Sequence, residues 1–187
     1  MKIAFITSEM APFAKTGGLA DVCGSLPTEI ARLGHSVKVF LPFYRMVREQ
    51  DLNYKFLVKV ESMSIAVGEE THLVRVLACD YRETVEVLFI QAPGFFDREQ
   101  LYGTPQGDYP DNDKRFCVFQ KAVLEALKRI DFQPGVLHCH DWQTGLIPAY
   151  IKKLYAEDSF YAQTKTIFTI HNLAYQGLFD IESRSEE

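Results

Sequence analysis

Residues Lys15 to Val22 read Lys-Thr-Gly-Gly-Leu-Ala-Asp-Val and stand between a short apolar run and a segment with helical spacing of its apolar residues. A strand that leads through a glycine pair into a helix brings backbone N–H groups and the positive end of the helix dipole to one point. With the Lys15 ammonium beside them, Gly17 and Gly18 predict a site for a diphosphate. The pattern is neither G-x-G-x-x-G nor G-x-x-x-x-G-K-[ST], so the two common nucleotide loops do not apply. The alternative, that the glycines only form a tight turn into the helix, stays open.

The apolar spacing around this loop predicts a strand–helix–strand unit. Residues 2–7 form a short apolar run without alternation, which is typical of a parallel strand covered on both faces. Over residues 19–33 the apolar side chains recur three or four positions apart, which predicts an amphipathic helix. Pro27 is expected to kink or split that helix, and Gly34 stands where a helix C-cap favours glycine. A second strand at 37–42 is expected to pair in parallel with the first through a right-handed crossover.

The remaining elements extend this unit into a layered domain. Residues 93–113 are rich in Gly, Pro, Asp and Tyr and predict a long loop, which in a compact domain is more often functional than idle. The helix after it is expected to take Asp111 or Asn112 as its cap. Two of the strand-like segments 54–67, 72–79 and 85–91 are expected to form a hairpin beside the main sheet or at its edge. Helical spacing at 116–130 and 146–154 alternates with strands at 136–139 and 165–170. The sequence therefore predicts one α/β domain over 1–187, with a mostly parallel, doubly wound sheet, helices on both faces and a β-hairpin insertion.

Composition narrows the class of protein. At 187 residues, of which 47% are hydrophobic, the chain is long enough to bury the core of one domain. The net charge of -5 comes from well-mixed acids and bases without a long basic run, which argues against a nucleic-acid partner. No stretch approaches the roughly 18 apolar residues of a membrane span, and the N-terminus is too polar for a signal peptide. The 4 cysteines lie far apart without a C-x-x-C pair, and are expected to be buried free thiols in a reducing cytoplasm.

Polar clusters follow three of the predicted strands. These clusters are Lys15–Gly18, His138–Trp142 and His171–Gly177. Ligands of an open parallel sheet bind beyond the carboxyl ends of its strands, so parallel strands would bring all three clusters into one cleft. A His-Asn pair at a strand end, followed by aromatic residues and glycine, is hard to explain as core. His171 and Asn172 are therefore the strongest single candidates for function.

Each cluster also has a structural explanation. His138 lies inside a strand and is slightly more typical of a satisfied core histidine than of a ligand-binding one. His140 and Asp141 could cap the helix that follows, and for Asp141 capping and function are equally favoured and compatible. Trp142 is more typical of packing than of stacking on a ligand. Asp21 lies in the first turn of a helix, where an acid is favourable in any case.

A metal site is the main chemical alternative. His138 and His140 share one face of a strand, and with Asp141 and His171 they could supply ligands to zinc or a similar ion. No further ligand set is evident in the sequence, and a metal centre would leave the glycine loop unexplained. We therefore expect no bound metal.

The three clusters, in this order, resemble the N-terminal half of bacterial glycogen synthases and plant starch synthases, which are retaining glucosyltransferases of the GT-B fold. The similarity runs through nearly the whole chain and is most specific in Lys15–Val22 and His171–Gly177. It implies a Rossmann-like domain that transfers glucose from ADP-glucose, or UDP-glucose, to the non-reducing end of an α-1,4-glucan. It implies no cofactor or metal, and neither a nucleic-acid nor a membrane partner. It also implies a bacterial cytoplasm, or a plastid in a plant once a transit peptide is removed.

The resemblance assigns roles to individual residues. His171 matches the active-site histidine, and Asp141 an acid near the sugar, so both are candidate catalytic residues. Lys15, Gly17 and Gly18 would lie against the donor diphosphate. The residues expected to bind sugar or acceptor are Asp21, Asn172 and Tyr175. One departure is Phe96, which aligns with a tyrosine in the family and would lose a hydroxyl contact.

The family's second domain carries the nucleotide-base contacts and further phosphate-binding groups. The resemblance places that domain beyond Glu187, so the 187 residues are expected to be a truncated N-terminal domain that is inactive alone. The polar residues 182–187 are expected to be a tail of artificial, proteolytic or natural origin. A non-catalytic glucan-binding or interaction domain stays open as an alternative. A different GT-B enzyme, such as a sucrose synthase-like one, is disfavoured by the glycine loop.

Overall fold

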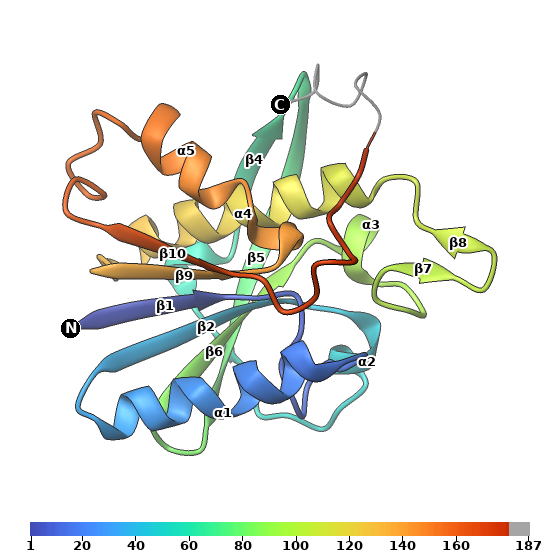
Figure 1. Ribbon diagram of the computed structural model, residues 1–187. Coiled ribbons are helices and arrows are strands. Elements are labelled where there is room, and N and C mark those ends of the chain that lie inside the picture. Colours follow the sequence, from blue (N-terminus) through green and yellow to red (C-terminus); the bar gives the residue numbers. More distant parts are fainter. Residues whose placement is uncertain (180–187) are drawn as a thin grey trace.

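The computed structural model describes residues 1–179, and the predicted tail at 182–187 lies outside that range. Its main sheet has the strand order β10-β9-β1-β2-β6-β5-β3 (Figure 1). The first five strands in that order pair in parallel, and β5 and β3 are antiparallel to their neighbours. The strands are β1 (Lys2–Ile6), β2 (Ser36–Pro42), β3 (Lys55–Phe56), β5 (Glu70–Tyr81), β6 (Val85–Gln91), β9 (Val136–His140) and β10 (Lys165–Thr169). The predicted α/β class with a mostly parallel sheet is confirmed.

Helices cover both faces of this sheet, as predicted. α1 (Gly18–Arg32) lies on one face, and α4 (Asn112–Arg129) with α5 (Ile147–Lys153) on the other (Figure 1). Short helical turns are α2 (Arg45–Arg48), α3 (Pro93–Phe96), η1 (Val58–Val60) and η2 (Trp142–Thr144). Because β1 lies between β2 and β9, the loops after β1 and β9 diverge at a switch point of the topology, where open α/β sheets bind ligands.

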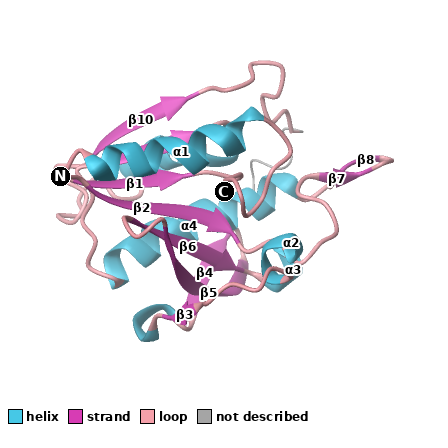
Figure 2. Ribbon diagram, turned by 90° about the horizontal axis from the view of Figure 1, so that it is seen from below, coloured by secondary structure: helices cyan, strands magenta, loops and turns pink. Residues whose placement is uncertain are grey.

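The middle of the chain forms the predicted antiparallel insertion with one correction. β5 pairs antiparallel with both β6 and β4 (Met63–Val67), so it forms two consecutive hairpins. Segment 54–67 is not one strand but breaks into β3, η1 and β4, because the alternation of buried side chains begins only at Met63. The predicted loop 93–113 contains α3 and a small hairpin of β7 (Gly103–Thr104) and β8 (Gly107–Asp108). That hairpin projects from the body of the domain (Figure 2).

Two local predictions for the helices need correction. α1 runs unbroken from Gly18 to Arg32, so Pro27 does not split it, because its buried face packs on β2 and β6, which offsets the lost hydrogen bond. The predicted kink at Pro27 stays a prediction. Asp111 stands at the N-cap of α4 but does not cap with its side chain. Its carboxylate instead accepts hydrogen bonds from both terminal nitrogens of Arg98, at 2.7 and 2.5 Å. Gly34 follows α1 with φ of 88°, a left-handed conformation that favours the glycine predicted there.

The cysteines are buried free thiols, as predicted. Burial raises the pKa of Cys23 and Cys139 to about 12 and that of Cys79 to about 11. Cys117 is buried as well. The thiols of Cys23, Cys79 and Cys139 are therefore poor nucleophiles, since the thiolate is the reactive form.

Candidate active site

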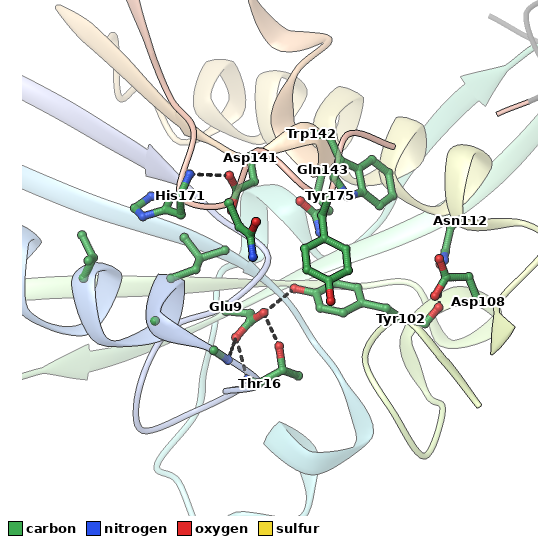
Figure 3. Close-up of a pocket in the computed structure, with 15 residues that line it drawn as sticks. Glu9, Thr16, Tyr102, Asp108, Asn112, Asp141, Trp142, Gln143, His171 and Tyr175 are labelled. Carbon is green, nitrogen blue, oxygen red and sulfur yellow. Dashed lines mark hydrogen bonds between the residues drawn. The ribbon is translucent and has the colours of Figure 1, made fainter. Parts of the chain in front are cut away.

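A cleft of about 720 Å³ opens at the carboxyl ends of β1, β9 and β10 (Figure 3). All three predicted clusters contribute to it, as the parallel sheet requires. Six of the eight predicted site residues line it: Gly17, Gly18, Asp141, His171, Asn172 and Tyr175. Its size is typical of a site for a small organic ligand. The predicted convergence of the strand ends is confirmed.

Glu9 is the polar centre of the β1 side of the cleft, and the sequence did not single it out. Its side chain is largely buried, with 4% of the residue exposed. Oε2 accepts hydrogen bonds from the backbone N–H of Thr16 (2.6 Å) and Gly17 (3.1 Å). Oε1 accepts from the Thr16 hydroxyl (2.5 Å) and the Tyr102 hydroxyl (2.9 Å; Figure 3). The Gly17 N–H expected to face a diphosphate is thus engaged by an internal carboxylate.

The glycine pair is nevertheless shaped for a ligand. Neither Gly17 nor Gly18 has a positive φ, so no left-handed turn requires glycine at either position. A Cβ built on either residue would meet nothing within 4 Å. No side chain caps the N-terminus of α1, which begins at Gly18. The first turn of α1 therefore offers N–H groups and partial positive charge to an anion in the cleft.

Lys15 and Asp21 are brought together, but outside the cleft. The Lys15 ammonium lies 2.6 and 2.8 Å from the two carboxylate oxygens of Asp21, and both side chains are exposed. Neither residue lines the main cleft. Asp21 borders a separate hollow of about 390 Å³ together with Tyr81 and Arg82. The roles of Lys15 at the diphosphate and Asp21 at the acceptor stay predictions.

Asp141 adopts an unusual backbone conformation at the end of β9. Its φ of 57° and ψ of 178° are sparsely populated by residues other than glycine, and such strain costs about 1–3 kcal/mol. The carboxylate does not cap the following turn, so the capping role considered from the sequence is wrong. Oδ1 instead accepts the backbone N–H of His171 at 2.7 Å (Figure 3). This bond ties the β9 cluster to the β10 cluster across the floor of the cleft.

The rings of three histidines, His138, His140 and His171, lie in a row beside this bond. The ring centroids of His138 and His140 are 4.1 Å apart, and those of His140 and His171 are 5.1 Å apart. His138 is half-buried, and its Nε2 lies 2.7 Å from the Thr169 hydroxyl, which fits the core histidine favoured from the sequence. His140 Nδ1 lies 2.8 Å from His171 Nε2. Within residues 1–179 no group of three or more His, Cys, Asp or Glu side chains is arranged to hold a metal ion.

Trp142 packs against the segment that carries Asn172 and Tyr175. Gly177 has a φ of 63°, and a Cβ on it would lie 2.5 Å from Cδ2 of the Trp142 indole. The indole also packs edge-on against Phe116 and Phe179, with ring centroids 5.1 and 5.2 Å away. The packing role favoured for Trp142 from the sequence is confirmed, although the residue also lines the cleft.

We expect Gly177→Ala to lower the free energy of unfolding by about 1–3 kcal/mol, because the added methyl overlaps the Trp142 ring and the backbone is left-handed. Thermal unfolding followed by circular dichroism measures this change. Gly94→Ala is the matched control, since a Cβ there meets nothing within 4 Å and its φ is not positive. Equal melting temperatures for the two variants would contradict the packing argument.

The long loop supplies further cleft residues to which sequence reasoning assigned no functional role. Tyr102, Asp108 and Asn112 line the cleft on the side opposite His171 (Figure 3). Burial raises the pKa of Tyr102 well above its usual range, so its hydroxyl stays a donor to Glu9. The length and composition of the loop indicated that it is functional. They did not indicate which of its side chains point into the cleft.

Buried Arg115 holds this loop in place. Its guanidinium donates to the carbonyls of Phe95 (2.8 Å) and Leu101 (3.0 Å) and to Asn112 Oδ1 (2.5 Å). It also lies 5.4 Å from the ring centroid of Phe96, which is fully buried and does not line the cleft. In this structure the ring at position 96 packs in the core, and the phenol by which this loop reaches the cleft belongs to Tyr102.

Comparisons with known proteins agree with this geometry. A family model described as "Starch synthase catalytic domain" matches residues 2–187. The chain is 48% identical to glycogen synthase 2 of Geobacter sulfurreducens over 188 residues, and 49% identical to glycogen synthase of Syntrophotalea carbinolica over 183 residues. These alignments cover 100% and 98% of this chain but 38% and 37% of those proteins.

A solved structure is similar over nearly the whole chain. It is the catalytic domain of starch synthase IV from Arabidopsis thaliana bound to ADP and acarbose, with a TM-score of 0.86 and 31% identity. The match covers 98% of this chain and 36% of that chain. The chain thus spans well under half the length of the curated relatives and of this structure. No helix within residues 1–179 is long and apolar enough to cross a membrane.

Proposed function

Because this chain belongs to the starch synthase catalytic domain family, we propose that it forms one wall of the active site of an α-1,4-glucan synthase. The reaction is transfer of glucose from ADP-glucose to the non-reducing end of a glucan with retained configuration. The observation that carries this proposal is the meeting of the glycine loop, Asp141 and His171 in one cleft at the switch point of the sheet. The related Arabidopsis structure, which is bound to ADP and acarbose, supports ADP-glucose and a glucan as the substrates.

The cleft suits the charge changes of this reaction. The leaving group is a nucleoside diphosphate, so negative charge grows on phosphate while the sugar becomes oxocarbenium-like. Preorganised N–H groups and positive dipoles stabilise such charge most effectively in a site shielded from water. We assign the uncapped first turn of α1, at Gly18 and Leu19, to the diphosphate. His171 and Asp141 are assigned to the transferred glucose, with Asn172 and Tyr175 on the sugar or acceptor side.

Lys15 takes part in this scheme only if its ion pair changes partners. A diphosphate carries more charge than the exposed Asp21 carboxylate, and exposed ion pairs contribute little stability, so the exchange is energetically inexpensive. Asp21, once released, is free to meet acceptor hydroxyls. The scheme uses no cofactor or metal ion. We place the protein in the cytoplasm, a compartment that suits its buried free thiols.

Isothermal titration calorimetry of the 187-residue chain tests the proposal. We expect binding of both ADP and a maltooligosaccharide, because both the α1 N-terminus and the sugar-side residues face the cleft. Glucan binding without any nucleotide binding would instead favour a non-catalytic glucan-binding domain. UDP in place of ADP measures which base is preferred. Radiolabelled transfer to glycogen by residues 1–187 alone tests the separate expectation that this chain is inactive by itself.

We expect His171→Ala, made in the protein at its natural length, to lower kcat for glucose transfer by about 10²-fold or more, the usual loss when one group that stabilises a transition state is removed. Release of ADP and incorporation of glucose into glycogen measure the change. His35→Ala is the control, because His35 contacts the terminal amino group of Met1 and not the cleft. Transfer by the His171 variant at the control's rate would contradict the assignment.

A further inference from the structure

His140 is a fully buried histidine that the proposed reaction does not use directly. It is the last residue of β9 and has no exposed surface. Its ring stacks on Phe5 with centroids 5.5 Å apart and an interplanar angle of 13°. The rings of His138 and His171 lie on its other sides. A polar ring that is buried to this extent needs an explanation, since buried polar groups are costly unless they are hydrogen-bonded.

Only one ring nitrogen of His140 has a hydrogen-bond partner among residues 1–179. Nδ1 lies 2.8 Å from Nε2 of His171, while Nε2 is buried without any partner. Burial, followed by the neighbouring His138 and His171, lowers the pKa of His140 to about 2, so its ring is neutral at physiological pH. A neutral ring carries a single proton, on Nδ1 or on Nε2.

The two placements of that proton have different costs. If it is on Nε2, a buried N–H points at no acceptor, and orphaned buried N–H groups are rare in proteins. If it is on Nδ1, the ring N–H of His140 has an acceptor, because Nδ1–H donates to His171 Nε2. The buried nitrogen without a partner is then Nε2 of His140, which carries no proton and therefore leaves no N–H without an acceptor.

We propose that His140 is a positioning residue that fixes the tautomer of His171 by donating its Nδ1–H to Nε2 of that ring. His171 then carries its proton on Nδ1, which is the ring nitrogen left for a ligand. The backbone N–H bond from His171 to Asp141 Oδ1 (2.7 Å) fixes the other end of the same residue. His171 therefore meets a ligand as a hydrogen-bond donor. This consequence rests on the proposed function, in which His171 contacts oxygen atoms of the transferred glucose.

Nitrogen-15 NMR of the histidine rings tests the assignment in the free protein, without any substrate. The signals of the 5 histidines are assigned by single substitution. We expect both His140 and His171 to be Nδ1–H tautomers, a distinctive result because free histidine favours the Nε2–H form. A His171 ring protonated on Nε2 in the unsubstituted protein would overturn the proposal.

Substitutions separate positioning from packing. His140→Phe keeps a ring on Phe5 but removes the donor, so we expect His171 to change tautomer and kcat at natural length to fall about 10- to 100-fold with little change in KM. His140→Asn keeps an amide N–H near the place of Nδ1, so it should retain the tautomer and recover most of kcat. His138→Phe is the matched control for the tautomer, because His138 bonds Thr169 and not His171.

The outcomes distinguish this proposal from the proposed function. An unchanged His171 tautomer and unchanged kcat in His140→Phe would refute the positioning role. If His140→Phe does not fold, the positioning role is still tested by two measurements. These are the tautomer of His171 in the unsubstituted protein and the kcat of His140→Asn. A protein that binds neither ADP nor glucan would refute the proposed function, while the tautomer measurement would stand on its own.

Discussion

Replacing Glu9 with alanine is expected to lower the free energy of unfolding by about 3 kcal/mol, among the largest effects of any single substitution in this domain. The carboxylate accepts four hydrogen bonds, from two backbone N–H groups and two hydroxyls. Removing it leaves buried donors without an acceptor, and each such loss costs about 1–3 kcal/mol. Water entering the vacated space would recover part of this cost. Urea denaturation followed by Trp142 fluorescence measures the change.

Two further variants make this result specific. Glu9→Gln keeps the size of the side chain but places an NH₂ group against hydrogen-bond donors. We therefore expect its free energy of unfolding to lie between those of the unsubstituted protein and Glu9→Ala. Glu69→Ala removes an exposed acid in the turn between β4 and β5 and is expected to change stability by no more than about 0.5 kcal/mol. If Glu9→Ala were as stable as Glu69→Ala, the carboxylate could not be what organises the glycine loop.

The role of Glu9 changes how the glycine loop is understood. The sequence predicts that backbone N–H groups of the loop bind a diphosphate. In the structure the Glu9 carboxylate already accepts hydrogen bonds from the backbone N–H groups of Thr16 and Gly17. The loop is therefore held in shape without a ligand, and the first turn of α1 is left uncapped beside it. Such preorganisation reduces the ordering cost of binding. It also places a negative charge near the anion site, where it disfavours anions that lie too deep in the cleft.

Much of the fold could be predicted because it follows from local patterns of apolar residues in the sequence. An apolar run without alternation identified β1, and the strand–helix–strand order predicted its parallel pairing with β2. Strands were also expected at β9 and β10, and parallel pairing of all these strands brings their polar ends together. Segment 54–67 was less predictable, because its mixed polarity is compatible with one irregular strand or with several short elements. The capping role of Asp111 failed because a tertiary partner, Arg98, competes for the carboxylate.

The site was predictable only where it depends on strand ends. Asp141 and His171 follow strands directly, so topology alone brings them together. Glu9, Tyr102 and Asn112 depend on how two irregular loops fold over one another, for which no periodicity exists in the sequence. For the same reason the sequence did not predict that Lys15 pairs with Asp21, or that both residues lie outside the cleft. A long side chain on a loop can reach several partners, and only three-dimensional geometry selects among them.

Replacing Gly17 and Gly18 together with alanine is expected to weaken ADP binding at least about tenfold, or 1.4 kcal/mol, while leaving the fold as stable as before. Neither residue has a positive φ and neither Cβ meets an atom within 4 Å, so the protein itself does not need glycine at these positions. Alanine at Gly18, in the first turn of α1, could even raise stability by up to about 1 kcal/mol. The requirement for glycine would then come from the ligand, whose approach to the backbone the two methyl groups obstruct. Calorimetric titration with ADP and thermal unfolding of the same samples measure both quantities.

The two explanations of the glycine pair predict opposite patterns in this experiment. If the glycines served only a tight turn, the double variant would lose stability and any loss of affinity would follow from unfolding. If they make room for a diphosphate, affinity falls while the melting temperature holds. Gly24→Ala provides the contrasting control, because a Cβ at Gly24 would lie 2.6 Å from the carbonyl oxygen of Ala11. That variant should lose stability, since α1 could no longer pack closely on the loop after β1. A double variant that behaves like Gly24→Ala would therefore assign the glycine pair to folding and remove it from the donor site.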